Sequence, residues 1–509
     1  MAVATTLAVS LIGLRGHVVE VQAHLAASVP GFSLVGLPDT ALAESRDRVR
    51  AAVTSSGLAW PVRKITVNLS PAALRKQGSG YDLAIAVAVL AGAGQLPAGG
   101  LEHVVHLGEL GLDGRVHPVR GVLPAVAAAV EAGYERVVVA SADVDEARLV
   151  PGARVVGAAS LAEVAALHGG DVPTVQAIEP VRRMRSGGFV REPGDLADVV
   201  GQSDARRALE IAAAGGHHLF LVGAPGSGKT MMASRLPGIL PDLTEAEAVE
   251  VTAVHSVVGA FDPAGGLIRR PPYENPHHTA TVAAVVGGGS GLPRPGAATR
   301  AHRGVLFLDE AAEFQPQVLE TLRQPLEQGE IMVHRSGGTA RYPARFQMVL
   351  AANPCPCGLA TGKGLACTCT PTMRRRYLGR LSGPLLDRVD LQVDVLPVDP
   401  VERACGPGEL TAVVARRVLA ARESARLRLR GTGWATNAEV SGAWLRERVI
   451  SGGKIDQIVA TALSSGRLSL RGVDRVLRVA WTMADLGGLD SPGTDEVSEA
   501  IALRGGPRG

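Results

Sequence analysis

Apolar positions recur along this chain with two different periods, and the changes of period divide it into segments. In the N-terminal sequence MAVATTLAVSLIGLRGHVVEV, apolar side chains occupy alternate positions, and Gly13 and Gly16 interrupt them, which predicts a pair of strands. KITVNLSP and RVVVA predict further strands, whereas DLAIAVAVLAGAG and VLPAVAAAVEAGY predict helices. Residues 1–170 are therefore expected to form an α/β domain.

The rest of the chain divides in the same way. Residues 171–195 contain prolines, charges and a Gly pair but no apolar period, which is typical of a linker. Residues 196–395 again alternate strand-like with helix-like runs. Residues 396–509 are mainly helical in pattern, as in LTAVVARRVLAARESARLRL. The predicted fold class is α/β, with a helical C-terminal domain.

Composition changes this picture only slightly. At 509 residues the chain is too long for a single core. Aromatic residues make up only 3%, which disfavours nucleic-acid binding built mainly on base stacking, and the net charge of +3 neither demands nor excludes a polyanionic partner. The N-terminus lacks the features of a signal peptide, and there is no apolar run of about 18 residues, so we expect a cytoplasmic protein without a membrane span.

The strongest chemical pattern is a glycine-rich turn between an apolar strand and a helical run. HLFLVGAPGSGKTMMASRL fits G-x-x-x-x-G-K-[ST], in which backbone N–H groups and the helix N-terminus face phosphate oxygens. Lys229 is expected to neutralise the β- and γ-phosphates of ATP, and the Thr230 hydroxyl to ligate Mg²⁺. The expected ATP contacts are Gly223, Pro225, Gly226, Ser227, Gly228, Lys229 and Thr230.

Two later strands carry polar residues at their ends. In RGVLFLDEA, four apolar residues precede Asp309, expected to hold Mg²⁺ through water, and Glu310, expected to orient and deprotonate the attacking water. The strand FQMVLAANP ends at Asn353, whose amide could reach the γ-phosphate or that water. This set of residues favours a hydrolase over a kinase.

Together these motifs resemble those of the Mg-chelatase-like AAA+ ATPases of the YifB/ComM group along nearly the whole chain. The resemblance rests on GAPGSGKT, NPHHTAT, GVLFLDE, ARFQMVLAANPCPCG, SGPLLDRVDL and RVLRVAWTMADL. It implies an AAA+ P-loop core with a parallel sheet, preceded by a Lon-protease-like α/β domain (S5 domain 2-like) and followed by a helical lid. The lid departs from the family pattern at Trp481, where an Arg is usual.

In AAA+ proteins a neighbouring subunit supplies an arginine to the active site. Arg388, in RLSGPLLDRVDLQVDV, matches this role, with a plain surface salt bridge as the alternative. Arg471, Arg475 and Arg478 lie on one predicted helical face, and Arg471 is chosen as the lid arginine that contacts nucleotide.

The resemblance places Gly80 where an active Lon-type protease has its nucleophilic Ser, and Leu123 where it has its Lys. Ser79 is one position away and has no evident base. We therefore expect a protease fold without proteolysis, which serves in assembly or in substrate docking.

The family resemblance also implies a homo-oligomeric, hexameric ring motor acting on DNA, with branch-migration or helicase activity in recombination or natural transformation. EIMVHRSGGTARYPARF supports this, because it predicts a hairpin with Arg335, Arg341 and Arg345, which could grip phosphates without reading sequence. The alternative is a solvated basic hairpin. The competing functions are a Mg-chelatase-type motor and a protein-remodelling ATPase that does not act on DNA.

Four of the five cysteines lie in one stretch, NPCPCGLATGKGLACTCT. Cys355, Cys357, Cys367 and Cys369 form two C-x-C pairs, which favours a structural Zn²⁺ over disulfides in a reducing compartment. An iron–sulfur cluster and free core cysteines are the alternatives. Such a site would brace the basic segment Arg374–Arg376, and Cys405 is expected to be unliganded.

The adjacent His277 and His278 are a weak metal candidate, because neighbouring residues seldom bind one ion and no acidic partner is close in sequence. Loop packing or backbone hydrogen bonding is the favoured interpretation.

Overall fold

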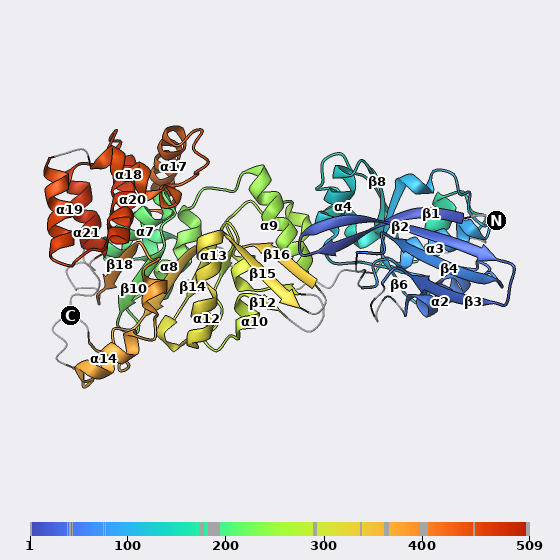
Figure 1. Cartoon of the computed structure of the whole chain (residues 1–509), viewed down its shortest axis with the longest axis horizontal. Coiled ribbons are helices and arrows are strands. Elements are labelled where there is room, and N and C mark those ends of the chain that lie inside the picture. Colours follow the sequence, from blue (N-terminus) through green and yellow to red (C-terminus); the bar gives the residue numbers. More distant parts are fainter. Residues whose placement is uncertain are drawn as a thin grey trace.

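The computed structural model is elongated, with three parts along its long axis (Figure 1). It describes residues 3–37, 39, 42, 44–74, 76, 78–172, 178–181, 194–288, 293–335, 338–360, 366–397, 406–450 and 453–504. Most of the predicted linker, 171–195, lies outside these residues, as does Cys405. Among the helices described, not one has both the length and the apolar character needed to cross a bilayer.

The N-terminal part is a mixed seven-stranded sheet in the order β3-β4-β2-β1-β5-β8-β9. Its strands are β1 (Val3–Ile12), β2 (Arg15–Ala26), β3 (Gly31–Val35), β4 (Lys64–Ser70), β5 (Val104–Leu107), β8 (Arg136–Ala140) and β9 (Arg154–Ala158), with β6 (Glu109–Leu110) and β7 (Val116–His117) as a separate short pair. Its helices are α2 (Ser45–Ser55), α3 (Asp82–Gly92), α4 (Val122–Glu131), α5 (Val144–Ala147) and α6 (Leu161–Leu167). The predicted strand pair and both predicted helices are confirmed.

Helices cover both faces of this sheet, as the unbroken burial of Thr6–Ser10 in β1 requires. Ala8 points into the core that contains α3, which is apolar after Asp82, whereas Leu7 and Val9 point into the core that contains α4. Successive side chains of a strand face opposite sides, so a run of apolar residues is buried on both. The β1 sequence therefore specifies a central strand.

The central part contains a parallel five-stranded sheet in the order β11-β14-β17-β10-β18. Its strands are β10 (Leu219–Gly223), β11 (Tyr273–Glu274), β14 (Val305–Leu308), β17 (Gln347–Ala352) and β18 (Leu391–Val395). Every residue of β10, β14 and β17 is buried, as expected for strands with both faces covered. All five strands run in the same direction, so the loops that follow them lie at one edge.

Helices and two small strand pairs complete the central part. The helices are α7 (Ser203–Gly215), α8 (Lys229–Ile239), α9 (Glu245–Val258), α10 (Val282–Val285), α11 (Ala297–Arg300), α12 (Pro316–Thr321), α13 (Arg323–Gln328), α14 (Pro371–Leu378) and α15 (Gly383–Leu386). The pairs are β12 (Gly287–Gly288) with β13 (Arg294–Pro295), and β15 (Glu330–Arg335) with β16 (Gly338–Pro343). The second pair confirms the predicted hairpin.

The C-terminal part is helical in its described residues, as the sequence predicts. It consists of α17 (Thr411–Arg428), α18 (Gly442–Val449), α19 (Lys454–Ser464), α20 (Leu470–Gly487) and α21 (Thr494–Arg504). One face of α20 is buried, and it shares a hydrophobic core with α7 and with the sheet strands β10 and β18. This shared core fixes the C-terminal helices against the central part.

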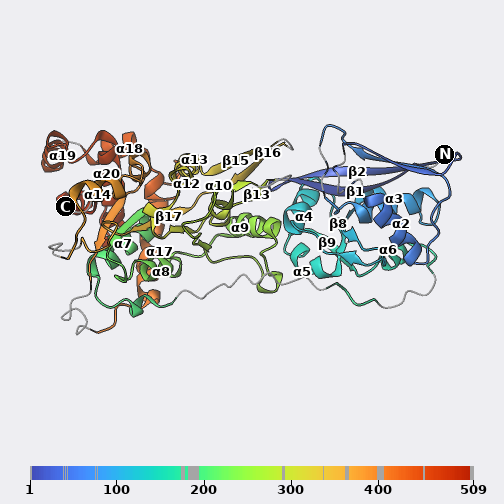
Figure 2. The ribbon, with the colours of Figure 1, turned by 90° about the horizontal axis from the view of Figure 1, so that it is seen from below.

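The N-terminal part docks on the central part through α4 and α9, which face each other in Figure 2. Ala253 of α9 is buried in the same core as Val126 of α4. The backbone N–H of Gly121 donates to the carbonyl oxygen of Ser256 at 3.2 Å, and the Ser256 hydroxyl donates to the carboxylate of Glu146. Polar and apolar contacts therefore both hold the two parts together.

A second contact joins the turn between β1 and β2 to the basic hairpin. Gly13, with φ of +66°, lies so close to β16 that a Cβ there would stand 2.8 Å from the carbonyl oxygen of Arg341. Leu14 packs against the core beneath this hairpin. The N-terminal part thus touches the hairpin directly.

Replacing Ala253 with Arg tests this docking. The substitution forces a charge into the apolar contact between α4 and α9, at a cost on the order of several kcal/mol. We expect the two parts to separate, which small-angle X-ray scattering of the nucleotide-free protein would record as a larger radius of gyration. Arg154→Ala, on the exposed edge strand β9, is the matched control. An unchanged radius in a folded Ala253→Arg protein would contradict the contact.

Candidate active site

The glycine-rich turn has the geometry of a phosphate cradle. It joins β10, which ends at Gly223, to α8, which begins at Lys229. Gly226 and Gly228 have φ values of +75° and +94°, and a Cβ at either position would meet no atom within 4 Å. The backbone is therefore open on the side where a ligand approaches. The Ser227 hydroxyl is buried without a protein partner, which also fits a polar ligand.

Lys229 lies across this turn. Its buried ammonium donates to the carbonyl oxygens of Gly223 and Ala224, both at 2.8 Å, and to Asn353 Oδ1 at 3.2 Å. Burial lowers the pKa of Lys229, and the carboxylates of Asp309 and Glu310 oppose that shift. A cation held among acceptors in this way is suited to an anionic phosphate chain.

The sheet order brings the later residues to the same place. β17 lies between β10 and β14, so Asn353, directly after β17, stands between the glycine-rich turn and Asp309. The Thr230 hydroxyl donates to Asp309 Oδ2 at 2.6 Å. Oxygen ligands from a hydroxyl and a carboxylate suit Mg²⁺ bound together with substrate phosphates, so both residues fit the predicted metal role.

Glu310 follows in a left-handed backbone conformation, with φ of +51°, and its N–H donates to Asp309 Oδ1 at 2.9 Å. Its side chain is about half exposed, and its Oε2 lies 3.0 Å from Nδ1 of His278. The sequence favoured loop packing or backbone hydrogen bonding for His278 and gave no sign of this pair, because residues 32 positions apart show no relation in one sequence.

Arg388 lies at the opposite end of the sheet from this site. It precedes β18 by three residues, and β18 runs parallel to β10 with Leu391 beside Leu219 and Val395 beside Gly223. Strands of this length span about 13 Å. The Arg388 guanidinium donates to the Pro384 carbonyl oxygen and pairs with the carboxylate of Glu327. It therefore faces away from its own glycine-rich turn.

The three arginines of α20 occupy different environments. Arg475 donates to Asp390 Oδ1 at 2.7 Å, and Arg478 donates to the Val440 carbonyl oxygen at 2.8 Å. Arg471 is exposed. Burial lowers the pKa of Arg388, and the nearby charges of Arg323, Arg475 and Arg471 lower it further. The structure thus brings Arg471 near Arg388 rather than to the glycine-rich turn of its own chain.

The basic hairpin is partly described. Arg341 is about half exposed and pairs with Glu330 across the two strands at 3.3 Å. Arg345 follows β16 and is also exposed, whereas the side chain of Arg335 lies outside the described residues. The hairpin presents arginines to solvent.

The four cysteines converge, and in the described part of the chain theirs is the one cluster of His, Cys, Asp and Glu ligand atoms suited to a metal. Their sulfur atoms all lie within 4.8 Å of one another. Cys355 Sγ lies 3.3 Å from Cys357 Sγ and 3.6 Å from Cys367 Sγ. Sulfurs around a tetrahedral Zn²⁺ stand about 3.8 Å apart. A hydrogen bond from the Leu359 N–H, with the neighbouring thiols, lowers the pKa of Cys357 to about 6. The donor set and spacing therefore fit zinc.

The cysteine loop also touches the glycine-rich turn, a contact the sequence analysis missed. Gly358 has φ of +76°, and a Cβ there would stand 2.5 Å from Cδ of Pro225. Cys355 follows Asn353 by two residues. The loop is thus tied to the phosphate cradle on two sides.

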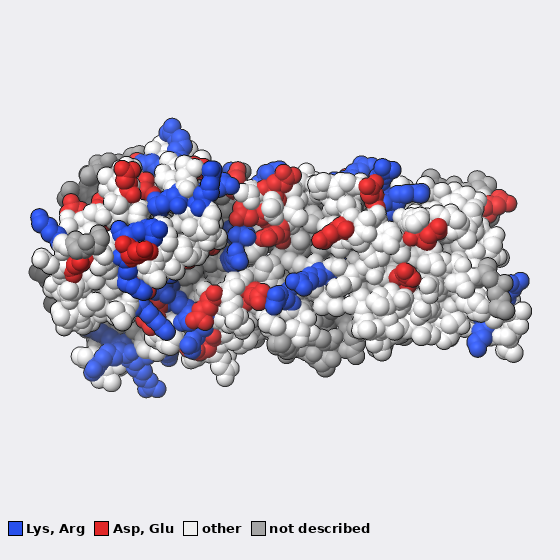
Figure 3. All heavy atoms as spheres, turned by 45° about the horizontal axis from the view of Figure 1, so that its top comes forward, with Lys and Arg blue, Asp and Glu red and all other residues white. Residues whose placement is uncertain are grey.

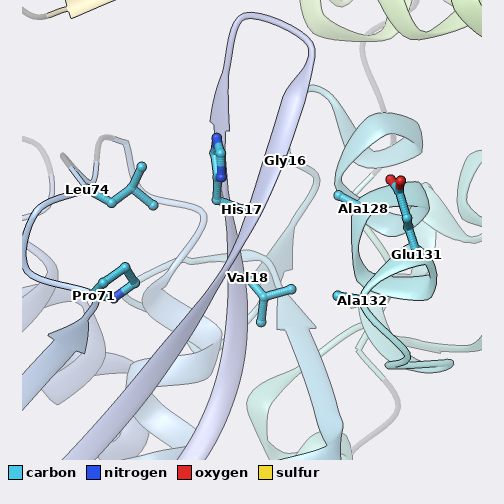
Figure 4. Close-up of a pocket in the computed structure, with 8 residues that line it drawn as sticks. All are labelled: Gly16, His17, Val18, Pro71, Leu74, Ala128, Glu131 and Ala132. Carbon is cyan, nitrogen blue, oxygen red and sulfur yellow. The ribbon is translucent and has the colours of Figure 1, made fainter.

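At the two positions where an active Lon-type protease has its Ser and Lys, the structure contains no catalytic pair. Leu123 is buried in the core around α4, and the Ser79 hydroxyl, next to Gly80, donates to the carboxylate of Glu109. A hollow of about 380 Å³ lies elsewhere in this part, between β2 and α4, and its lining includes His17, Val18 and Glu131 (Figure 4). Neither place joins a nucleophile to a Lys.

Comparison with known proteins connects these observations. Residues 195–403 match the family model of magnesium chelatase subunit ChlI, residues 20–143 match that of subunit ChlI of Mg-chelatase, and residues 408–504 match that of the ChlI C-terminal region. A shorter match, 30% identical over 182 residues, relates 32% of the chain to Lon protease 2 of Bacillus subtilis. It agrees with a Lon-like part in the fold.

Three relatives align over nearly the whole chain. An uncharacterized protein of Mycobacterium tuberculosis is 52% identical over 504 residues, which cover 99% of both chains. YifB of Escherichia coli is 39% identical over 97% of this chain and 95% of its own. Competence protein ComM of Haemophilus influenzae is 39% identical over 99% of this chain and 98% of its own. With a P-loop, acidic strand end and Asn on one parallel sheet, the chain belongs to the Mg-chelatase-like AAA+ ATPases of the YifB/ComM family.

Proposed function

We propose that this protein is a ring-forming, Mg²⁺-dependent ATPase that moves on DNA and promotes branch migration or strand separation. The observation that carries the ATPase is the meeting of the glycine-rich turn, Asp309, Glu310 and Asn353 at one edge of the sheet. Family membership supports ATP and Mg²⁺ as substrate and cofactor. The proposal that the ATPase acts on DNA is supported by the hairpin arginines and by the relationship to a competence protein.

Within one chain, each residue has a distinct task. Backbone N–H groups of the glycine-rich turn and Lys229 bind the phosphates, and Thr230 and Asp309 hold Mg²⁺, which would neutralise charge on the β- and γ-phosphates. The carboxylate of Glu310 takes the proton of the attacking water as the γ-phosphorus–oxygen bond to ADP breaks. Asn353, already bonded to Lys229, fixes the position of the γ-phosphate or of that water.

The positive charge that completes each active site comes from arginines of a second copy of the chain. Arg388 lies at the far end of its own sheet, and this position supports the proposal that it reaches a nucleotide bound by a neighbour. Arg471, close to Arg388, is assigned the same neighbour-directed role. Each active site is then completed between subunits, and repetition of this head-to-tail contact closes a ring, for which we propose six members.

DNA is proposed as the polymer because the exposed arginines are suited to phosphates. On the face shown in Figure 3, Lys and Arg side chains gather, among acidic ones, over the central and C-terminal parts, and few lie over the N-terminal part. Arg341 and Arg345 stand on a projecting hairpin. Contacts of this kind are independent of base sequence, as a translocating motor requires.

The cysteine cluster is proposed to hold a structural Zn²⁺. Four thiolates close its coordination shell and leave no open position for catalysis. The ion would fix Gly358 against Pro225 and brace α14, which carries the exposed Arg375 and Arg376. The N-terminal part, with Gly80 and Leu123 at the dyad positions, is proposed to serve in assembly or docking rather than in proteolysis.

DNA is expected to stimulate ATP hydrolysis by this protein. We expect single-stranded DNA and a synthetic four-way junction to raise the ATP hydrolysis rate several-fold at low salt, and rising salt to diminish the effect as phosphate contacts weaken. Glu310→Gln should abolish hydrolysis under all conditions.

The double variant Arg341→Ala/Arg345→Ala should keep the DNA-free rate and lose most of the stimulation. Arg154→Ala, which removes an exposed arginine far from the hairpin, should retain it. A wild-type rate that ignores every form of DNA would count against the DNA motor and favour a chelatase-type or protein-remodelling ATPase.

The four-cysteine cluster is expected to bind zinc. Purified protein should contain one Zn²⁺ per chain by atomic absorption, and Cys357→Ser/Cys367→Ser should contain none. Loss of the ion frees the loop at Gly358, so we expect a lower melting temperature and weaker binding of a fluorescent ADP analogue.

Cys405→Ser is the control, because that cysteine lies 36 positions beyond Cys369 in the sequence. Wild-type protein that binds no zinc, or a zinc-free variant with unaltered nucleotide affinity, would refute the proposed site or its contact with the P-loop.

A further inference from the structure

The loop that follows β11 presents two adjacent histidines with different partners. His277 Nδ1 lies 2.8 Å from the Thr279 hydroxyl oxygen and also accepts from the Thr279 N–H. The ring centroids of His277 and His278 lie 4.1 Å apart, with the ring planes tilted by 33°. His278 Nδ1 lies 3.0 Å from Glu310 Oε2. Only the second histidine therefore reaches the carboxylate assigned as the general base.

The His278 contact affects the carboxylate of Glu310, which is the proposed general base. A carboxylate only accepts hydrogen bonds, so a proton on His278 Nδ1 is donated to Oε2 and occupies a lone pair there. The backbone N–H of Glu310 is bonded to Asp309, and the Glu310 side chain is about half exposed, so the carboxylate has room to change its rotamer. While His278 holds the carboxylate, Oε2 is turned toward the loop and is engaged there instead of accepting a hydrogen bond from the attacking water.

The same loop is packed against the basic hairpin. After His278 the chain forms α10, β12 and, beyond residues 289–292, β13. Val285 of α10 lies in one hydrophobic core with Ile331 and Tyr342 of the hairpin strands. The Tyr342 hydroxyl, fully buried, donates to the carbonyl oxygen of Pro293. A displacement of the hairpin therefore acts on the loop through close-packed side chains.

We propose that His278 is a positioning residue that holds Glu310 away from the attacking water until the hairpin engages its polymer. The coupling to a polymer rests on the proposed DNA motor, whereas the restraint on Glu310 rests on the His278 contact alone. Engagement of the hairpin shifts the loop, breaks the His278–Glu310 contact and frees the carboxylate. Hydrolysis is slow in the idle protein for this reason.

The test is the DNA-free ATPase rate of His278→Ala. We expect kcat to rise several-fold without DNA, KM to change little, and the further stimulation by single-stranded DNA to shrink. His278→Asn, whose amide can still donate to the carboxylate, should remain close to the wild-type rate. His277→Ala is the matched control, since His277 bonds Thr279 instead, and it should also leave the rate low.

Binding of a fluorescent ATP analogue and the melting temperature establish that each variant is folded and loaded. A folded His278→Ala protein whose DNA-free kcat is unchanged or lower would overturn the proposal, even if DNA still stimulates it. A raised kcat in a protein that DNA never stimulates would support the restraint and refute the DNA motor. The two proposals therefore fail in distinguishable ways.

Discussion

The strand order of the five-stranded parallel sheet is the constraint on which the active site depends. With β17 between β10 and β14, three loops at one edge carry Lys229, Asn353 and Asp309 to within bonding distance of their partners. Those residues come from three segments spread over 125 positions of sequence, from Lys229 to Asn353. Parallel strands end at the same edge, so a substitution that disturbed this order would scatter the site rather than weaken one contact.

The same constraint separates Arg388 from its own nucleotide. A residue just before a strand and a residue just after its parallel neighbour are kept a full strand length apart. Asp390, beside Arg388, is buried and bonded to Arg475 of α20, and burial, which alone would raise its pKa, is outweighed by His217 and Arg475, which lower it. The ion pair between Asp390 and Arg475 ties the C-terminal helices to the end of the sheet that carries Arg388. Arg388 and Arg471 lie near this anchored pair, on the surface that we propose meets a neighbouring subunit.

Much of this could be predicted from the sequence, because local patterns specified it. Gly226, Gly228 and Lys229 identify a phosphate-binding turn, and the apolar run before Asp309 identifies a buried strand, since both depend on residues adjacent in the chain. The hairpin and the convergence of the four cysteines were also predictable from spacing. The contacts between distant segments were not.

Nothing in a single sequence relates His278 to Glu310, Gly358 to Pro225, or Gly13 to Arg341, because each pair is created by the packing of separate loops. The placement of Arg471 near Arg388 likewise follows from the docking of α20 on β18, not from its helical face. Even so, these contacts connect the Lon-like part, the hairpin and the cysteine loop to the candidate ATP site.

The most direct measurement is ATP hydrolysis by mixtures of Arg388→Ala and Glu310→Gln proteins. Each variant alone lacks one half of every active site and should be nearly inactive, since an arginine of this kind is worth a factor on the order of a thousand in rate. In a random mixture, roughly a quarter of the interfaces pair an intact Glu310 with an intact Arg388 from the neighbour. We predict that mixing restores a corresponding part of the wild-type rate. A mixture that stays inactive, or an Arg388→Ala protein that hydrolyses ATP at the wild-type rate alone, would contradict an active site shared between subunits.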